Sequence, residues 1–363
     1  MNNHAGTPVV IKADSLLTDK GIITDNFTLK VLNGRFQEIG KSAGYDNELA
    51  AMDLTGFTIC PTFCDYHLHF SKKSIDDPES ISTVLLQYGI TRVWDGGDKD
   101  FSSLPCKKLF QGRIEVVTSS CALYRKGTYG NFLGTGVASA DEAKAVIDQE
   151  VCNRGVDTVK VINSGVVDTQ TGKITEGGFT KNELCKIIAY AREKGFPVTC
   201  HANGDRAVLD GIDAGASTIV HGFFITPKAL ARMIEKNVAF VPTSYAFYSL
   251  SKKTNAAHIR ERIVTITEQH SGTVKMASDM GVKILAGSDS MPSFLPYGET
   301  FFEELRFLEA AGLGFEKTLM TAVNEPLKPG AQADFLVLDD LKIHSVFIRG
   351  QRLTTPSSWK TDF

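Results

Sequence analysis

The 363-residue chain has no long apolar run, no excess of one charge and no secretory signal, and each absence excludes a class of protein. No window approaches the roughly 18 consecutive apolar residues that a transmembrane helix needs. The formal net charge of -3 provides no basic surface for nucleic acid or an anionic membrane. The first residues contain neither a positive region nor an apolar region, so we expect a cytoplasmic protein with a small-molecule substrate.

The cysteines also argue against a secreted protein held together by disulfide bonds. They are seven in number and scattered, so we interpret them as free thiols in a reducing compartment. Cys60 and Cys64 are separated by three residues and no second pair follows, which makes a structural zinc site a poor interpretation. Self-association into a homo-oligomer is left open by these patterns.

The two ends of the chain have the same character. Residues 1–56 contain short β-like runs, with a hairpin-turn signal at Asn33-Gly34. Residues 330–353 return to strand-like sequence. We therefore predict that 1–56 and 326–363 together form a small composite β-sandwich domain that flanks a larger domain at 57–325.

Between these ends the pattern alternates strand and helix. Capping boxes at 139–142 and 180–183 mark two helix starts. Eight apolar runs read as buried strands, at about 57–63, 90–95, 113–118, 158–162, 196–201, 217–221, 238–242 and 282–286. This rhythm predicts an α/β protein with a (β/α)8 TIM barrel. A doubly wound open sheet is the alternative, but no glycine-rich phosphate loop occurs in the right context.

The stretch Asp65-Tyr66-His67-Leu68-His69 follows the first predicted strand. Side chains two residues apart point to the same side of an extended backbone, so His67 and His69 could reach one metal ion. Taken alone, this pair is equally compatible with two solvated histidines. Asp65 is expected to lie outside the ligand set, in contact with the ligands.

Further titratable residues lie at the ends of later predicted strands, where barrel enzymes hold their chemistry. They are Lys160, His201, His221 and Asp289. Each has an ordinary explanation: an edge lysine, two hydrogen-bonded core histidines and a turn aspartate. Their joint occurrence at strand ends favours a single metal centre. The other histidines, His4, His258, His270 and His344, are interpreted as solvated.

With these residues in place, the chain resembles the amidohydrolase superfamily of metal-dependent hydrolases. The marks are the Asp65-x-His67-x-His69 motif, Lys160, and the histidine and aspartate motifs at His201, His221 and Asp289. The resemblance covers nearly the whole chain, to the closing segment 329–335, and is greatest to the prolidase-like and imidazolonepropionase-like branch.

The resemblance implies a binuclear site with two divalent metal ions, zinc being the expected element. His67, His69 and Asp289 would hold one ion, and His201 and His221 the other. Lys160, carboxylated by carbon dioxide to a carbamate, would bridge them. A metal-bound hydroxide would attack a C–N bond of an amide, peptide or cyclic amide, with Asp289 as the proton shuttle.

The chain departs from the family pattern at several points. Thr62 and Cys64 stand where the family commonly has Gly and Ile or Val, and Asn163 to Val166 lack a common double glycine. The segment between 321 and 330 is compressed. None of these departures removes a predicted ligand, but they mean that the substrate of this chain is not to be inferred from the substrates of its relatives. From loop position we predict substrate contacts by Tyr124, Arg125, Ser244 and Tyr245, with a solvated loop as the equal alternative.

Two other functions compete with the binuclear hydrolase. A mononuclear zinc deaminase would use His67, His69, His201 and Asp289, but deaminases of this superfamily lack the bridging lysine that Lys160 provides. A catalytically retired scaffold would keep the fold without the chemistry. Such relatives usually lose ligands, and this chain retains all six.

Overall fold

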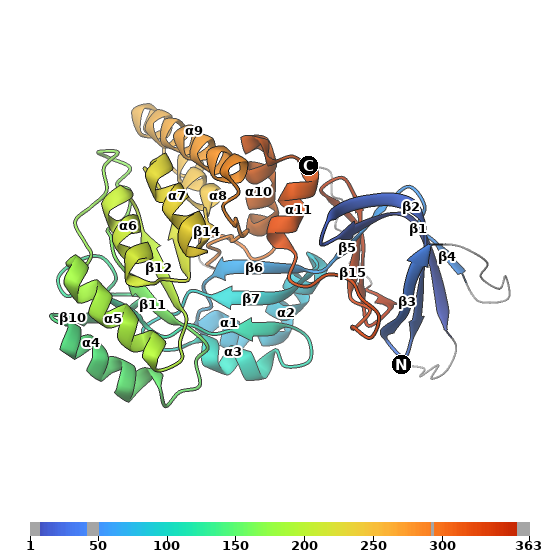
Figure 1. The fold of residues 1–363 in the computed structure, drawn as a ribbon, viewed down its shortest axis with the longest axis horizontal. Coiled ribbons are helices and arrows are strands. Elements are labelled where there is room, and N and C mark those ends of the chain that lie inside the picture. The colour runs from blue at the N-terminus through green and yellow to red at the C-terminus, as the bar shows by residue number, and fades with distance from the viewer. Residues whose placement is uncertain (1–7, 42–50, 292–293, 354–363) are drawn as a thin grey trace. The chain divides into compact units, whose positions relative to one another are not determined.

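The computed structural model describes residues 8–41, 51–291 and 294–353 (Figure 1). His4 lies outside these ranges. By contacts the chain divides into two compact units, and each mixes distant parts of the sequence. The first contains Met1–Cys64, Thr83–Thr91 and Gly314–Phe363, and the second contains Asp65–Ser82 and Arg92–Leu313.

The first unit is built on an eight-stranded, mostly antiparallel sheet. Its path runs through β17 (Gln351–Arg352), β16 (Lys342–Ile348), β15 (Phe335–Asp339), β5 (Thr58–Pro61), β1 (Val9–Thr18), β2 (Gly21–Leu32) and β3 (Arg35–Lys41), with β4 (Ala51–Asp53) beside β1. The two ends of the chain lie in one sheet, and β5 joins them because it lies between β1 and β15. The predicted first barrel strand at 57–63 was therefore wrong in its bounds, since it is divided between β5 of this sheet and the start of the next strand, β6 (Phe63–Leu68).

The core of this unit lies inside a bend of that sheet. Phe36 of β3 contacts Phe335 of β15, with ring centroids 6.0 Å apart, and the backbone N–H of Phe36 donates to the carbonyl of Ala331 at 3.0 Å. The expected sandwich is therefore formed by one sheet that bends over a single apolar core. Asn33 and Gly34 both have positive φ, which is the geometry that the predicted hairpin turn requires.

The second unit contains two parallel sheets, and the strands in the middle of the larger one are almost fully buried. One is six-stranded, in the order β10 (Gly134–Val137), β9 (Ala122–Arg125), β11 (Val159–Ile162), β12 (Val198–Ala202), β13 (Thr218–His221) and β14 (Ala239–Val241). The other contains β6 (Phe63–Leu68), β7 (Ile90–Asp95) and β8 (Glu115–Val117). Parallel strands with both faces covered are expected to be largely apolar, as β11, β12, β13 and β14 are, whereas β10 contains two glycines and is mostly half-buried.

Single parallel bridges extend the pairing beyond these sheets. Ser119, after β8, pairs with Thr158, before β11. Phe240 of β14 pairs with Ile284, and Leu68 of β6 pairs with Ser290. Both partners lie in the segment that follows α9 (Ala257–Met280). The predicted strand at 282–286 thus lies beside β14, but it makes only a single bridge with that strand and not a continuous run of paired residues. Asp289, at φ 52°, departs from extended geometry just after it.

Helices alternate with these strands, and neighbours along the chain pack together (Figure 1). Ser139 and Thr180 cap helices as predicted, each accepting from the backbone N–H three residues later. The helices are α1 (Lys72–Asp76), α2 (Pro78–Gln87), α3 (Ser103–Leu109), α4 (Ala140–Val146), α5 (Lys181–Glu193), α6 (Asp205–Ala214), α7 (Pro227–Lys236), α8 (Ser244–Tyr248), α9 (Ala257–Met280), α10 (Glu299–Leu308) and, in the first unit, α11 (Phe315–Ala322).

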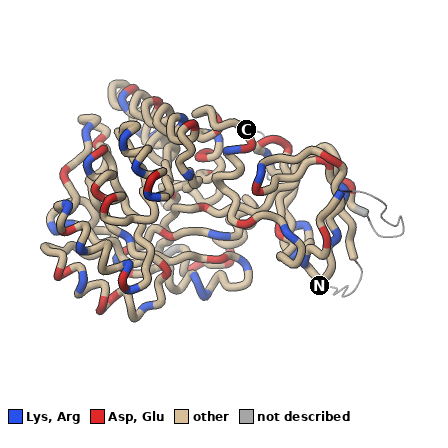
Figure 2. Tube along the Cα trace, in the orientation of Figure 1, with Lys and Arg blue, Asp and Glu red and all other residues tan. Residues whose placement is uncertain are grey.

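The short elements β9 and α8 lie where we predicted loops with substrate contacts, at Tyr124 and Arg125 and at Ser244 and Tyr245. Figure 2 shows acidic and basic residues interspersed along the described chain. Among the helices of the described ranges, none combines the length and hydrophobicity that crossing a bilayer requires.

Candidate metal centre

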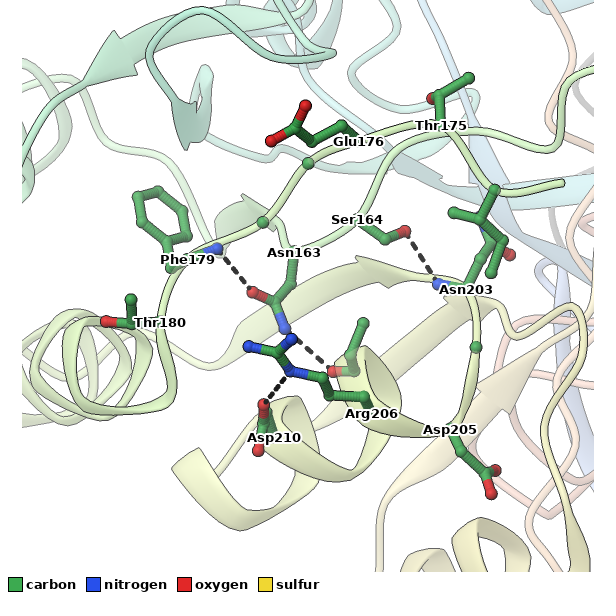
Figure 3. A pocket seen from close by; sticks show the side chains of 15 residues that line it. Asn163, Ser164, Thr175, Glu176, Phe179, Thr180, Asn203, Asp205, Arg206 and Asp210 are labelled. Atoms are coloured by element: carbon green, nitrogen blue, oxygen red, sulfur yellow. Dashed lines mark hydrogen bonds and ion pairs between the residues drawn. The ribbon is translucent and has the colours of Figure 1, made fainter.

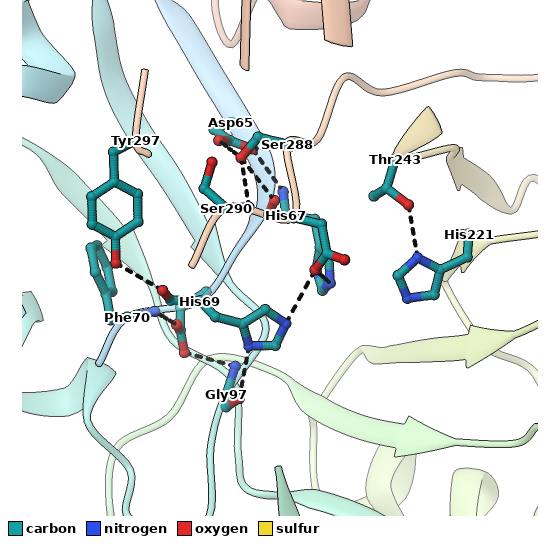
Figure 4. Close-up of polar contacts among 12 residues, drawn as sticks. Asp65, His67, His69, Phe70, Gly97, His221, Thr243, Ser288, Ser290 and Tyr297 are labelled. Atoms are coloured by element: carbon teal, nitrogen blue, oxygen red, sulfur yellow. Dashed lines mark hydrogen bonds and ion pairs between the residues drawn. The ribbon is translucent and has the colours of Figure 1, made fainter. Parts of the chain in front are cut away.

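Two histidines at the end of β6 (Figure 4) converge with one loop aspartate in the second unit. Nε2 of His67 and Nε2 of His69 each lie 3.4 Å from Oδ1 of Asp289. One ligand atom from each of these residues falls within 4.8 Å of the others. Imidazole nitrogens with a carboxylate oxygen form a donor set that suits zinc and similar divalent ions.

The position of Asp289 is set by a residue next to the histidines. Asp65 is buried, and its Oδ1 accepts from the backbone N–H of Ser288 at 2.9 Å. The backbone N–H of Asp289 donates in turn to the carbonyl of His67 at 2.6 Å. Asp289 has φ 52°, a left-handed conformation that aspartate tolerates better than most residues. Asp65 therefore contacts the loop that carries Asp289, outside the group of three converging residues.

The ring of His69 is oriented by a backbone carbonyl. Its Nδ1 lies 3.1 Å from the carbonyl oxygen of Gly97, which can only accept. Nδ1 therefore carries the hydrogen, and the lone pair of Nε2 faces Asp289. Gly96 is necessary beside it, because the first side-chain carbon of any other residue would overlap the rings of both His67 and His69.

A second pair of histidines, His201 at the end of β12 and His221 at the end of β13, lies beside the first. Their ring centroids are 4.5 Å apart, and the ring of His221 is 5.8 Å from that of His67. Nδ1 of His221 lies 2.7 Å from Oγ1 of Thr243, whose hydroxyl donates to the carbonyl of Pro242 at 2.7 Å. The hydroxyl must accept from His221, which leaves Nε2 of His221 as the free donor atom.

His201 is oriented in the opposite sense. Its Nε2 lies 3.2 Å from the carbonyl oxygen of Gly165, so Nε2 carries the hydrogen and Nδ1 is free to bind an ion. Burial lowers the pKa of His201 to about 4 and the pKa of His67 to about 3. Both imidazoles are therefore neutral at neutral pH, which is the form that coordinates metals.

Lys160 completes the group. It stands in β11 with only 2% of its surface exposed, and it lines the same cavity as the four histidines and Asp289. Burial lowers the pKa of its amine to about 8. A neutral amine, the form that reacts with carbon dioxide, is consequently more accessible here than for a surface lysine.

The structure brings together all six residues predicted as ligands, but it does not bring the four predicted substrate contacts to the cavity. Arg125 in β9 pairs with Glu183 of α5, at 2.5 Å between Nη1 and Oε1. The backbone N–H groups of Ser244 and Tyr245 donate to the carboxylate of Glu304 in α10. Tyr124 and these three residues are absent from the described cavity lining.

The cavity has a volume of about 550 Å³ and two chemically different parts. Its floor consists of the polar residues His67, His69, Lys160, His201, Asn203, His221, Thr243 and Asp289. Its wall is apolar. One half of the wall comes from Tyr129, Phe132, Leu133, Val166, Val167 and Phe223, and the other from Ala246, Phe247, Leu250, Met291, Phe294 and Leu295.

Sequence reasoning missed nearly all of this wall. The available signal was the apolar residues that directly follow predicted strand ends, such as Phe223 two residues after His221 and Met291 two residues after Asp289. Tyr129 lies four residues after Arg125, one of the predicted substrate contacts. Its ring lies 5.5 Å from the ring of His201, which places it where the wall meets the floor.

Hydrogen bonds behind the centre fix the loops after β11 and β12 (Figure 3). Oδ1 of Asn163 accepts from the backbone N–H of Phe179 at 3.1 Å, and its Nδ2 donates to the carbonyl of Ala207 at 2.9 Å. Oγ of Ser164 accepts from the backbone N–H of Asn203 at 2.9 Å. These contacts surround a second hollow of about 470 Å³ and hold together the strands that carry Lys160 and His201.

The interpretation of His270 as a solvated residue was wrong. It lies on the buried side of α9, where its ring stacks on Phe223 at 3.9 Å between centroids. Its Nε2 lies 3.2 Å from the carbonyl oxygen of Pro242, and burial lowers its pKa to about 4. The helix periodicity at this position favours the interior. His258 and His344 are exposed, as predicted.

Comparisons with known proteins agree with this geometry. A model of the amidohydrolase family matches residues 58–353. Among solved structures, the chain is similar to a Xaa-Pro dipeptidase with bound methionine, with a TM-score of 0.80 and 19% identity over 96% of this chain and 100% of that one. It is also similar to the ochratoxinase of A. niger, with a TM-score of 0.73 and 18% identity over 95% of both chains. At such identities the likeness concerns the fold.

The chain is also similar to a third solved structure and to a curated protein. Phenylurea hydrolase B has a TM-score of 0.74 and 16% identity over 96% of this chain and 97% of that one. An uncharacterized protein of Mycobacterium tuberculosis is 28% identical over 200 residues, which cover 52% of this chain and 51% of that protein. The chain thus spans about half the length of the curated relatives it matches.

Proposed function

Because the chain belongs to the amidohydrolase family, we propose that it is a metal-dependent hydrolase that cleaves a C–N bond of a small molecule with a binuclear centre. The observation that carries this proposal is the convergence of His67, His69 and Asp289, whose ligand atoms lie within 4.8 Å of one another beside the buried amine of Lys160. A group of four histidines, a carboxylate and a lysine in one buried cavity floor is typical of a functional site.

The residues present fit two divalent ions of the zinc type. His67, His69 and Asp289 would hold one, and Nδ1 of His201 with Nε2 of His221 the other. The hydrogen bonds to Gly97, Gly165 and Thr243 support this assignment, since each fixes the tautomer that leaves a free nitrogen facing the floor. When bound, such ions polarise a carbonyl and lower the pKa of water.

Lys160 would bridge the two halves of the centre as a carbamate. Its neutral amine forms a bond to the carbon of carbon dioxide and loses one proton, which gives an anion with two oxygen donors. The lowered pKa of this buried amine, about 8, supports that reaction. A cationic lysine in the same place would repel divalent ions.

Asp289 would handle the protons of hydrolysis. Its carboxylate stands beside both His67 and His69 at the floor of the cavity. In this position it can accept a proton from the attacking water and pass it to the leaving nitrogen as the C–N bond breaks. The substrate would be an amide, a peptide or a cyclic amide.

We further propose that the parallel strands of 57–325 close into a (β/α)8 barrel. The bridges of Ser119 with Thr158, Phe240 with Ile284, and Leu68 with Ser290 support closure, since they connect the two parallel sheets at both edges. The predicted bounds of the composite domain, 1–56 and 326–363, are narrower than the first unit, which extends to Cys64, includes Thr83–Thr91 and begins again at Gly314.

A metal count combined with hydrolysis assays tests the function. The protein is purified in the presence of zinc and bicarbonate, its ions are counted by mass spectrometry, and dipeptides, N-acyl amino acids and neutral anilides are assayed. We expect two ions per chain. Lys160→Ala should lose one ion and most of the hydrolysis, whereas Lys228→Ala, on the exposed start of α7, should change neither.

Two results would argue against the proposal. If Lys160→Ala retained both its metal content and its hydrolytic activity, the bridging role would be wrong. If the protein bound one ion and released ammonia from an amine substrate, the mononuclear deaminase would be the correct function.

A further inference from the structure

The wall of the cavity carries an inference about the substrate, which rests on the proposed function. We infer that the substrate is an uncharged amide with aromatic or branched apolar groups beside the scissile bond, and not a dipeptide or N-acyl amino acid with a free carboxylate there. The loops after β9, β11, β13 and β14 and the segment after Asp289 each place apolar side chains on this wall.

Charge is confined to the floor. Among the described residues that line the cavity, the only Lys, Arg, Asp or Glu side chains are Lys160 and Asp289, and both belong to the proposed centre. A substrate carboxylate against the wall would lose its water without gaining a cation. Burial of a carboxylate without a compensating partner disfavours binding of the charged form.

Basic residues near the cavity are already engaged elsewhere. Nη1 of Arg125 pairs with Glu183, and Nη1 of Arg262 donates to the carbonyl of Thr169 at 3.1 Å. Nζ of Lys253 donates to the carbonyl of Phe294 at 2.7 Å and lies over the ring of the same residue. None of these three residues lines the cavity, so none of them places a cation against the wall.

The residues at the opening of the cavity also favour an apolar substrate. Phe132 and Phe294 line the cavity, yet 49% and 42% of their surfaces are exposed. Phe132 also makes an edge contact with Tyr129, whose ring lies deeper, beside His201. Exposed aromatic rings at a cavity mouth are stabilised when an apolar ligand covers them, and aromatic ligands pack on them well. A volume of about 550 Å³ is ample for such a molecule.

Two chromogenic amides test the inference, because they share one scissile bond and differ by one carboxylate. They are the butanoyl amides of 4-nitroaniline and of 3-carboxy-4-nitroaniline, assayed with the zinc-loaded protein. We expect kcat/KM to be at least about tenfold higher for the neutral amide. A preference for the carboxylated amide would overturn the inference.

A cation placed in the wall should reverse this selectivity. Phe132→Arg is expected to shift the ratio of the two kcat/KM values by at least about tenfold toward the carboxylated amide. The matched control is Ile234→Arg, an exposed position of α7 outside the cavity lining, which should leave the ratio unchanged. If both variants gave the wild-type ratio, the wall would not determine selectivity and the inference would fail.

Binding separates this inference from the proposed function. N-butyl-4-nitroaniline and its 3-carboxy derivative keep the shape of the amides but have no bond to hydrolyse, and their binding is measured by calorimetry. Tighter binding of the neutral amine without hydrolysis of either amide would support the wall preference and contradict the hydrolase. Tighter binding of the carboxylated amine would overturn the wall preference whatever the enzyme hydrolyses.

Discussion

Asp65 and Ser288 are 223 positions apart in the sequence, and the hydroxyl of Ser288 donates to Oδ2 of Asp65 at 2.5 Å. The backbone N–H groups of Ser288 and His67 both donate to Oδ1 of the same carboxylate. One buried side chain therefore fixes the strand that carries two ligand histidines against the loop that carries Asp289. The relative position of the three converging residues depends on this contact.

Removing the Ser288 hydroxyl should weaken ion binding. Ser288→Ala leaves Oδ2 of Asp65 without this donor and loosens the loop, so we expect zinc affinity to fall about 10- to 100-fold. Competition with a chromogenic chelator measures the change. Ser290→Ala is the matched control, since its hydroxyl contacts the carbonyl of Pro296 and not Asp65. Equal zinc affinities for the two variants would show that the Asp65 contact does not position the ligands.

A single methyl group at Gly96 should disrupt the centre. The added carbon overlaps the rings of His67 and His69, so we expect Gly96→Ala to lose zinc and hydrolysis together. Gly272→Ala, in the interior of α9 and facing open space, should keep both and gain about 0.5–1 kcal/mol of stability. Metal content and urea unfolding distinguish the two variants. A Gly96→Ala protein with full zinc content would mean that the rings can move aside.

Glu304 should make stability depend on pH. Burial raises its pKa to about 7, against 4.5 for an ordinary glutamate. Since the folded-state pKa is the higher one, the stabilisation from its proton is full below pH 4.5 and is lost as the pH rises through 7. A pKa unit corresponds to about 1.4 kcal/mol, so the change can reach roughly 3 kcal/mol.

Glu304→Gln removes this titration and keeps an oxygen acceptor for one of the two backbone N–H groups, of Ser244 and Tyr245, that donate to the carboxylate. We expect the free energy of unfolding of the wild type to fall relative to that of the variant between pH 5 and pH 8. Urea unfolding at several pH values measures the difference. Parallel curves for the two proteins would rule out Glu304 as the titrating group.

Occupancy of the proposed bridge should rise with pH and with bicarbonate. The neutral fraction of Lys160 grows as the pH rises toward and through its pKa of about 8, and only that form reacts with carbon dioxide. We expect zinc content after dialysis to increase from pH 6 to pH 8.5, and more so with bicarbonate. In Lys160→Glu a carboxylate is already present, so the bicarbonate effect should vanish. An equal bicarbonate response in both proteins would contradict carbamate formation.

The sequence predicted the floor better than the wall, and the reason is physical. His201 and His221 end continuous apolar runs, and the end of a buried parallel strand has a defined place in this type of fold. A lysine inside an apolar run is costly without a partner, which marked Lys160 as unusual. These signals are local, so a single sequence carries them.

The features that a single sequence does not announce depend on contacts between distant segments. Arg125 was expected to meet a substrate, but its partner Glu183 lies 58 positions away and no local pattern announces it. The strand β10 contains Gly134 and Gly136, which lower its strand propensity, yet Gly134 is required because a side chain there would overlap the backbone of Ala122. Phe132, Phe223 and Phe294 gather on one wall only after the strands are assembled.

The division between floor and wall has an evolutionary consequence. Four of the eight floor residues, His67, Lys160, His201 and His221, stand on strands of the parallel sheets, whereas the wall is supplied by several separate loops. A loop can accept substitutions or insertions without altering the register of the strands beneath it. Evolution can therefore change the substrate specificity of such a protein through one loop at a time, while the residues of the floor stay the same.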